Sequence, residues 1–147
     1  MNNENVKPSD RATLVGVIDP DVSPAATYTT GWIDMALWGS LMGVIFAGTL
    51  GTNATVDGKF EQATSAAGAG AKDVTGKAIT QLTQAGTDSD KQAILNLQGE
   101  DLDVPGGFRW ARLSVTVAVA TSDLGAAVFG FDSRYAPADA STVDEVV

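Results

Sequence analysis

The chain contains neither cysteine nor histidine. Without cysteine it can form no disulfide, no thiolate zinc site and no cysteine nucleophile. Without histidine it lacks the commonest general base and the commonest metal ligand, and a Ser-His-Asp triad is excluded. The 147 residues must therefore be stabilised by packing and association, and we expect no cofactor.

Positive charge is also scarce. Nine Lys and Arg residues stand against 18 Asp and Glu residues, which gives a formal net charge of −9. The basic residues are scattered, and the tightest group is Arg109 with Arg112. Proteins that grip nucleic acid need clustered Lys and Arg, so this composition argues against a nucleic-acid partner. It favours solubility and a partner surface that is neutral or basic.

No long hydrophobic run is present. The N-terminal residues "MNNENVKPSDR" have no apolar core of the kind a signal peptide requires, and the absence of cysteine suits folding in a cytosolic compartment. Residues 35–56 carry no charge, but their apolar part fades after Leu50, and Asp34 and Asp57 flank them. A membrane span needs roughly 20 mainly apolar residues. We therefore expect buried strand here and no membrane partner.

The glycine-rich stretch "GAGAKDVTGKA", residues 68–78, resembles a phosphate-binding loop only superficially. The Walker pattern G-x-x-x-x-G-K-[ST] would require glycine at Ala71 and a hydroxyl at Ala78. The dinucleotide pattern G-x-G-x-x-G fails at Asp73, whose charge would also repel a pyrophosphate. The sequence predicts a mobile loop without a nucleotide.

Short apolar segments separated by turn residues recur about every dozen residues, which is typical of a β-sandwich or barrel. We expect an all-β, single-domain, jelly-roll-like β-sandwich of about seven or eight strands over residues 12–135. Residues 1–11 form an expected flexible N-terminal arm, and residues 136–147 an acidic C-terminal tail. The strands are expected at 12–18, 27–34, 41–50, 55–63, 77–83, 92–98, 108–120 and 126–135.

Several local features refine this expectation. The strand from residue 12 should end at the turn residues 19–21. Residues 41–50 are apolar on both faces and predict a central strand. Strands 55–63 and 77–83 should be joined by a long loop, and 126–135 should pair with 108–120 across a turn at 121–123. Residues 92–98 favour a strand; the alternative is a short helix, since Ser89 and Gln92 have capping-box spacing.

Side-chain alternation assigns faces to these strands. In 55–63, Val56, Gly58 and Phe60 face one way, and Asp57, Lys59 and Glu61 the other. In 92–98, one face carries Ala93, Leu95 and Leu97. In 108–120, one face carries Leu113, Val115, Val117 and Val119, and the opposite face carries Trp110, Arg112, Ser114 and Thr116.

Carboxylates are the remaining candidates for chemistry. They cluster as Asp19 with Asp21, Asp88 with Asp90, and Glu100 with Asp101 and Asp103. Two facing carboxylates can hydrolyse a glycoside, and calcium needs six or more oxygens at a suitable spacing. None of the clusters has a calcium-loop spacing, and acidic residues beside turns are usually solvated. We therefore expect no enzyme activity and no metal site.

The aromatic residues offer a possible contact surface. Trp110 shares a face with Arg112 and follows Arg109, and Trp and Arg are enriched in binding hot spots. Together with Trp32, these residues are the candidate partner-contact residues, for another subunit or for a sugar. The alternative is a tryptophan packed under arginine side chains with no partner.

Several segments taken in order, "PAATYTTGWIDM", "GTLGTNATVDGKFEQATSAAGAGAKDVTGKAITQLT", "FRWARLSVTVA" and "GFDSRYAP", carry a resemblance over residues 23–137. They resemble small proteins found with the head genes of tailed bacteriophages and of related gene transfer agents. The resemblance implies a virion structural protein: a capsid decoration or cement protein, or the base of a head spike, often with a jelly-roll fold.

A non-enzymatic protein on the capsid exterior is thus expected, with the major capsid protein as partner. Symmetry implies a homo-oligomer, with a trimer favoured and a pentamer possible. The alternatives are a head-spike base or a carbohydrate-binding adhesive module, and a small enzyme that uses carboxylates.

Overall fold

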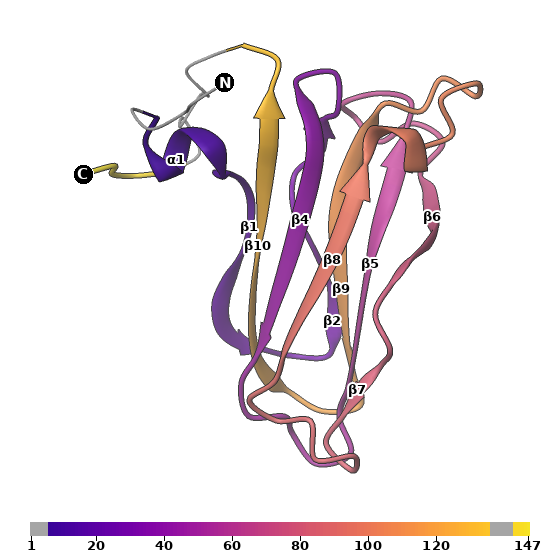
Figure 1. The fold of residues 1–147 in the computed structure, drawn as a ribbon. Coiled ribbons are helices and arrows are strands. Elements are labelled where there is room, and N and C mark those ends of the chain that lie inside the picture. Colours follow the sequence, from indigo (N-terminus) through magenta and orange to yellow (C-terminus); the bar gives the residue numbers. More distant parts are fainter. Residues whose placement is uncertain (1–5, 136–142) are drawn as a thin grey trace.

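The computed structural model describes residues 6–135 and 143–147, and within them the chain forms two antiparallel sheets packed face to face (Figure 1). The four-stranded sheet has the order β1-β10-β4-β8, and the six-stranded sheet has β2-β9-β5-β6 with β3 and β7 added at its margins. The strands are β1 (Thr13–Ser23), β2 (Ala26–Thr29), β3 (Ile33–Asp34), β4 (Trp38–Ala47), β5 (Thr55–Ala63), β6 (Lys72–Ala78), β7 (Leu82–Thr83), β8 (Gln92–Gln98), β9 (Trp110–Ala118) and β10 (Ser122–Ser133). One helical turn, α1 (Pro8–Arg11), precedes them, and a 3-10 turn, η1 (Gly99–Asp101), follows β8.

The pairing pattern is that of a jelly roll. β1 pairs with β10, β2 with β9, β4 with β8, and β5 with β6, all antiparallel. The chain thus runs as one long antiparallel ribbon that doubles back between β5 and β6 and wraps around a common core. This confirms the all-β sandwich, and eight strands remain when the two-residue β3 and β7 are set aside.

The core lies between the two sheets. The largest side chains that are less than 2% exposed are Phe60, Leu41, Ile45, Leu97, Leu113, Val56, Val115, Val117 and Val128. They come from β4, β5, β8, β9 and β10, and those on one strand are two or four residues apart, as expected for side chains on a single face. The inward faces predicted for 55–63 and 92–98 are confirmed, and so is that for 108–120 as far as Val117.

β4 confirms the expectation of a central strand for residues 41–50, since it lies between β10 and β8, but the strand ends at Ala47 and is not buried on both faces, because the outward Phe46 is 53% exposed. Its inward residues Leu41 and Ile45 are almost completely buried. The strand assignment for 92–98 is also confirmed, as β8, in place of the helix alternative. Within the residues that the structure describes, no helix has the length and apolar character needed to cross a membrane.

The predicted end of the first strand at residues 19–21 is wrong. β1 continues to Ser23, and its register against β10 shifts between Ile18 and Asp21. Pro20 lies in this irregularity, and a Cβ added to Gly125 opposite would be 2.9 Å from the Pro20 Cα atom. Because β1 is an edge strand, a bulge accommodates a residue that cannot donate a ladder hydrogen bond.

The predicted pairing of 126–135 with 108–120 is also wrong. β10 pairs with β1 and β4, and β9 pairs with strands of the other sheet. Val119, expected in the core, is 71% exposed and has φ of 72°, so it belongs to the connection that crosses between the sheets. Ser114 lies on the outer face as expected, opposite Lys59, but its neighbours bury it.

The loop between β5 and β6 is shorter than the long loop predicted between strands 55–63 and 77–83. β6 begins at Lys72, where residue 72 pairs with Gln62 and Asp73 pairs with Glu61. Only residues 64–71 form the connection, and they are held by backbone hydrogen bonds such as Thr64 N to Ala69 O at 3.0 Å. Residues 77–83 are divided between the end of β6 and β7.

The first residue in a strand is Thr13 and the last is Ser133 among the described residues. Pro8–Arg11 forms a helical turn within the predicted arm, and the Thr13 hydroxyl donates to the Ser9 carbonyl at 2.7 Å. Residues 1–5 of the predicted arm and 136–142 of the predicted tail lie outside the described residues.

Truncation of Phe60 to alanine tests the position of the core. Phe60 is fully buried, whereas Phe46 is 53% exposed on the outside of β4. We expect Phe60→Ala to lower the free energy of unfolding by about 3–5 kcal/mol, because it removes buried apolar surface and leaves a cavity. The matched variant Phe46→Ala should cost less than about 1 kcal/mol in urea unfolding. Equal losses in the two variants would contradict the assignment of inner and outer faces.

Candidate functional site

The four predicted contact residues do come together, on the outer face of the six-stranded sheet near β3. The Arg112 guanidinium carbon lies 4.4 Å from the centre of the Trp32 ring. The corresponding distance from Arg109 to the Trp110 ring is 5.6 Å. Both pairs have the geometry of cation–π contacts. Both tryptophans thus pack against arginine side chains, an arrangement that a contact surface and the predicted alternative have in common.

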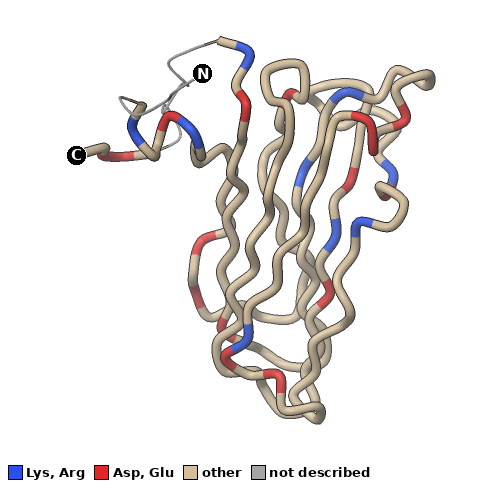
Figure 2. Tube along the Cα trace, in the orientation of Figure 1, with Lys and Arg blue, Asp and Glu red and all other residues tan. Residues whose placement is uncertain are grey.

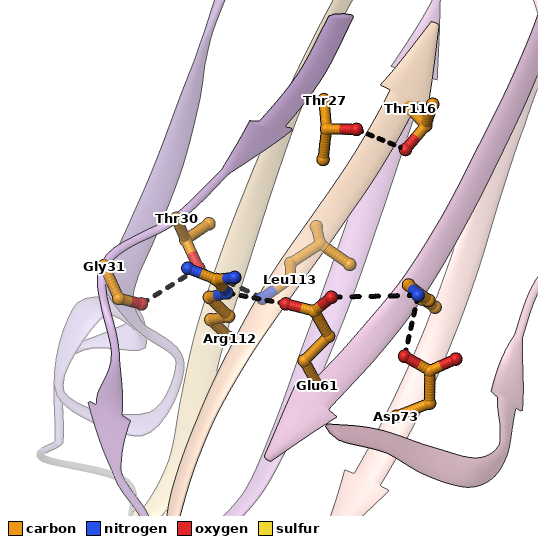
Figure 3. A network of polar contacts seen from close by, with 9 residues as sticks. Thr27, Thr30, Gly31, Glu61, Asp73, Arg112, Leu113 and Thr116 are labelled. Carbon is orange, nitrogen blue, oxygen red and sulfur yellow. Dashed lines mark hydrogen bonds and ion pairs between the residues drawn. The ribbon is translucent and has the colours of Figure 1, made fainter. Parts of the chain in front are cut away.

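A row of alternating charges continues from Arg112 across β9, β5 and β6 (Figure 3). Arg112 Nε donates to Glu61 Oε2 at 2.7 Å. Lys59 Nζ donates to Asp73 Oδ1 at 2.7 Å and lies 3.7 Å from Glu61 Oε1. The hydrogen bond to Asp73 is the main reason that the pKa of Lys59 is raised. These side chains therefore satisfy one another across three strands, and they bridge β6 to β9.

A second ion pair holds β3 to the segment that precedes β9. Arg109 Nε donates to Asp34 Oδ1 at 2.6 Å, and the backbone N–H of Ala36 donates to the same oxygen at 2.9 Å. The Asp34 side chain is only 12% exposed. The hydrogen bond from Arg109 is the largest effect on Asp34 and lowers the pKa of its carboxyl group.

The glycine-rich loop has a packing role that the sequence did not reveal. Gly68 has φ of 82°, and a Cβ added there would lie 2.6 Å from Nε1 of Trp32. Any other residue would be strained in the backbone and would collide with the indole. Trp32 is thus contacted by Arg112 and by the 64–71 turn. This explains the glycine without a phosphate ligand.

The predicted carboxylate clusters fix turns. Asp101 accepts from the backbone N–H of Gln98 at 2.7 Å, and Asp103 accepts from that of Gly106 at 3.0 Å. Asp88 accepts from the backbone N–H of Thr83 at 2.9 Å. Each also meets a lysine: Lys77, Lys72 and Lys91 respectively. Across residues 6–135 and 143–147, no three Asp or Glu side chains gather as metal ligands would.

Sequence reasoning missed a second surface, the outer face of the four-stranded sheet. We call it the apolar face; its apolar members are Leu14, Val17, Met42, Val44, Phe46, Ile94, Ala127, Phe129 and Phe131. One row crosses all four strands, since Val17 pairs with Ala127, Ala127 with Val44, and Val44 with Ile94. Ile94 is 59% exposed and Val17 is 40% exposed.

The rest of the apolar face is uncharged but polar. Along β4 and β8, the outward positions that are not apolar are Ser40, Gln92, Asn96 and Gln98. In Figure 2, the front strands of the sandwich are almost free of charge along their middle, and the red and blue segments gather at their ends and on the other sheet. The signal in the sequence was the apolar character of both faces of 41–50, which is also the mark of a strand buried on both sides.

Comparisons with solved structures give alignments at low sequence identity, with TM-scores below 0.5. Neither a protein-family model nor a curated protein sequence matches the chain. A chain of the Broad Bean Stain Virus structure aligns at 10% identity with a TM-score of 0.47, over 99% of each chain. A chain of the infectious bursal disease virus Gx strain aligns at 12% identity and a TM-score of 0.45, over 86% of this chain and 33% of that one. A chain of a Cowpea Mosaic Virus empty virus-like particle gives 12% identity and 0.40, over 90% and 86%.

Substitution of Gly68 tests the packing of Trp32. Gly68→Ala should lower the free energy of unfolding by at least about 2 kcal/mol, because it combines backbone strain with a collision against the indole. Gly76 is a matched control, with φ of 76° and open space where its Cβ would be. Gly76→Ala should cost only about 1 kcal/mol. Denaturant unfolding and tryptophan fluorescence measure the difference, and equal losses with unchanged emission would show that the indole does not contact the loop.

The Asp34–Arg109 pair predicts a pH dependence. The carboxyl pKa of Asp34 is lowered in the folded state, so its contribution is present above the unfolded value of about 3.9 and is lost as pH falls through the folded value. We expect Asp34→Asn to melt at a lower temperature than the unchanged protein at pH 7, and the gap should shrink below about pH 3. The control is Asp57→Asn. Among the described contacts, the Asp57 carboxylate accepts a hydrogen bond only from the neutral Gln81 amide, so the difference in melting temperature at pH 7 should be smaller for this variant. A gap for Asp34→Asn that is independent of pH would contradict the assignment.

Proposed function

We propose that the chain is a non-enzymatic virion structural protein, a capsid decoration or cement protein that binds the outer surface of the shell built by the major capsid protein. The observation that carries the proposal is the contrast between the two outer faces of the sandwich. The four-stranded sheet presents the uncharged apolar face, and the six-stranded sheet presents paired charges. One face thus suits burial against protein and the other suits solvent. The resemblance of residues 23–137 to head proteins of tailed bacteriophages supports the same role.

The mechanism would be thermodynamic. A subunit that binds only the assembled shell stabilises the shell by mass action, by about 2.7 kcal/mol at 100 times its dissociation constant. A compact jelly roll needs no cofactor for this, and its ordered turns present a rigid surface. The proposal includes a location on the virion exterior after synthesis in the host cytoplasm, and self-association in which a trimer is favoured and a pentamer possible.

The adhesive-module alternative finds less support. A sugar-binding site usually offers an aromatic ring for stacking. Trp32 is contacted by Arg112 and the Gly68 turn, and Trp110 by Arg109. A head-spike base remains within the same proposal, because it also binds the shell exterior and differs only in its position on the particle.

Addition of the purified protein to empty shells that lack it tests the function. We expect saturable binding at a fixed ratio to the major capsid protein and a higher melting temperature of the shell, because binding adds contacts that only the shell provides. Sedimentation with the shells and scanning calorimetry measure the two effects. Shells saturated beforehand with the same protein provide the control. Absence of the polypeptide from purified virions in mass spectrometry would refute the proposal.

A further inference from the structure

The apolar face is bordered by carboxylates at both ends. At one end, Asp21 and Asp123 line a hollow together with Phe46. At the other end, Glu100 and Asp132 line a hollow together with Ser40 and Gln98. The outward positions of β4 and β8 between these ends carry no charged side chain.

Like Asp19, Asp57 and Asp90, these four carboxylates lack an ion pair among the described residues, which distinguishes them from the paired acidic groups of the sandwich. Asp34, Glu61, Asp73, Asp88, Asp101 and Asp103 all form ion pairs. Among residues 6–135 and 143–147, Asp21, Asp123, Glu100 and Asp132 form no ion pair within 4.0 Å. Lys91 precedes β8 at the Phe46 end, and its Nζ forms an ion pair with Asp88 Oδ1 at 2.8 Å. The four border carboxylates are therefore not ion-paired, although one cation, Arg134, follows Asp132 at the Ser40 end, where it donates to the Ala36 carbonyl.

We infer that the apolar face is the surface that binds the shell, and that the matching surface of the shell protein is apolar at its centre and bordered by Lys or Arg at both ends. This inference rests on the proposed function and deepens it. An apolar centre supplies the affinity when water is removed, and the oppositely charged borders supply register and partner choice. Trp32, Arg109, Trp110 and Arg112 then lie on the sheet that faces away from the shell.

A second copy of the chain fits the apolar face less well. In a two-fold pairing of two such faces with their strands nearly aligned, carboxylate ends meet carboxylate ends, because both ends are acidic. Each chain also has a net charge of −9. Unpaired carboxylates brought together in an interface are repulsive and poorly solvated. A partner with basic borders removes both penalties.

The area of the apolar face is smaller than that of a standard protein interface, as expected if each subunit makes one of several contacts on a repeating shell. Four strands about 4.8 Å apart and about seven residues long present roughly 450 Å². Both partners together would bury about 900 Å², which is below the standard interface of about 1,600 Å². Binding through this face alone should therefore be moderate, and several copies linked in one oligomer would raise it through multivalency.

A charge placed in the centre of the face tests the inference. Ile94 is 59% exposed on the apolar face, and Val104 is 62% exposed in the loop before β9. We expect Ile94→Glu to weaken binding to empty shells by at least about tenfold, because a carboxylate would be buried against an apolar partner. The matched control Val104→Glu should bind within about twofold of the unchanged protein. Circular dichroism and melting temperature check that both variants are folded.

The border is tested by salt. Binding of the unchanged protein to the shells should weaken several-fold between about 50 and 300 mM NaCl, because salt screens attraction between exposed charges. The double variant Asp123→Asn with Asp132→Asn should bind more weakly at low salt and lose most of this dependence. Asn is compatible with the left-handed backbone at Asp132, where φ is 53°. Binding of the unchanged protein that does not change with salt would overturn the basic-bordered partner.

Three other outcomes have distinct meanings. Normal shell binding by Ile94→Glu, with loss of binding in Arg112→Ala, would overturn this inference and leave the proposed function standing. Loss of self-association by Ile94→Glu in light scattering, with unchanged shell binding, would assign the face to a second copy and overturn it too. Failure of the unchanged protein to bind shells at all would refute the proposed function and the inference together.

Discussion

Strict two-residue alternation along paired strands is the constraint on which the structure depends. On β5, Phe60 points into the core while Lys59 and Glu61 point outward, and the partner β9 repeats this with Leu113 and Arg112. A slip of one residue would bury the charges and expose the phenyl ring. The ion pairs that cross β9, β5 and β6 can form only in this register, so the outer face follows from the inner one.

The four-stranded sheet cannot be fixed in the same way, because both of its faces are apolar. Its register is instead restricted by glycines that lie against large neighbours. A Cβ at Gly43 would meet the Phe60 ring at 3.2 Å, and one at Gly130 would lie 2.5 Å from Trp38. A one-residue shift would place a side chain where only hydrogen fits. Close packing thus replaces polarity as the source of register.

The same distinction decides what could be predicted from the sequence. The inner and outer faces of 55–63 and 108–120 could be predicted because alternation depends only on neighbouring residues. Val119 is the exception, because nothing in the adjacent sequence indicates its positive φ. The change of sheet between β9 and β10 is set by contacts distant in sequence, so the predicted hairpin between them was wrong. The pairing of Trp32 with Arg112 joins residues 80 positions apart, and the grouping of Trp32 with Arg109, Trp110 and Arg112 rested on residue type alone. The apolar face was missed because an exposed strand with two apolar faces has the same pattern as a buried one.

An uncharged face on a chain of net charge −9 needs a physical explanation, because exposed apolar surface promotes association without selectivity. The unpaired carboxylates at its two ends supply one. They oppose the pairing of two copies through this face, and they attract a surface whose border is basic. The same four side chains can therefore act on solubility and on choice of partner. The paired charges of the opposite sheet cannot do this, because their fields are already cancelled by their neighbours.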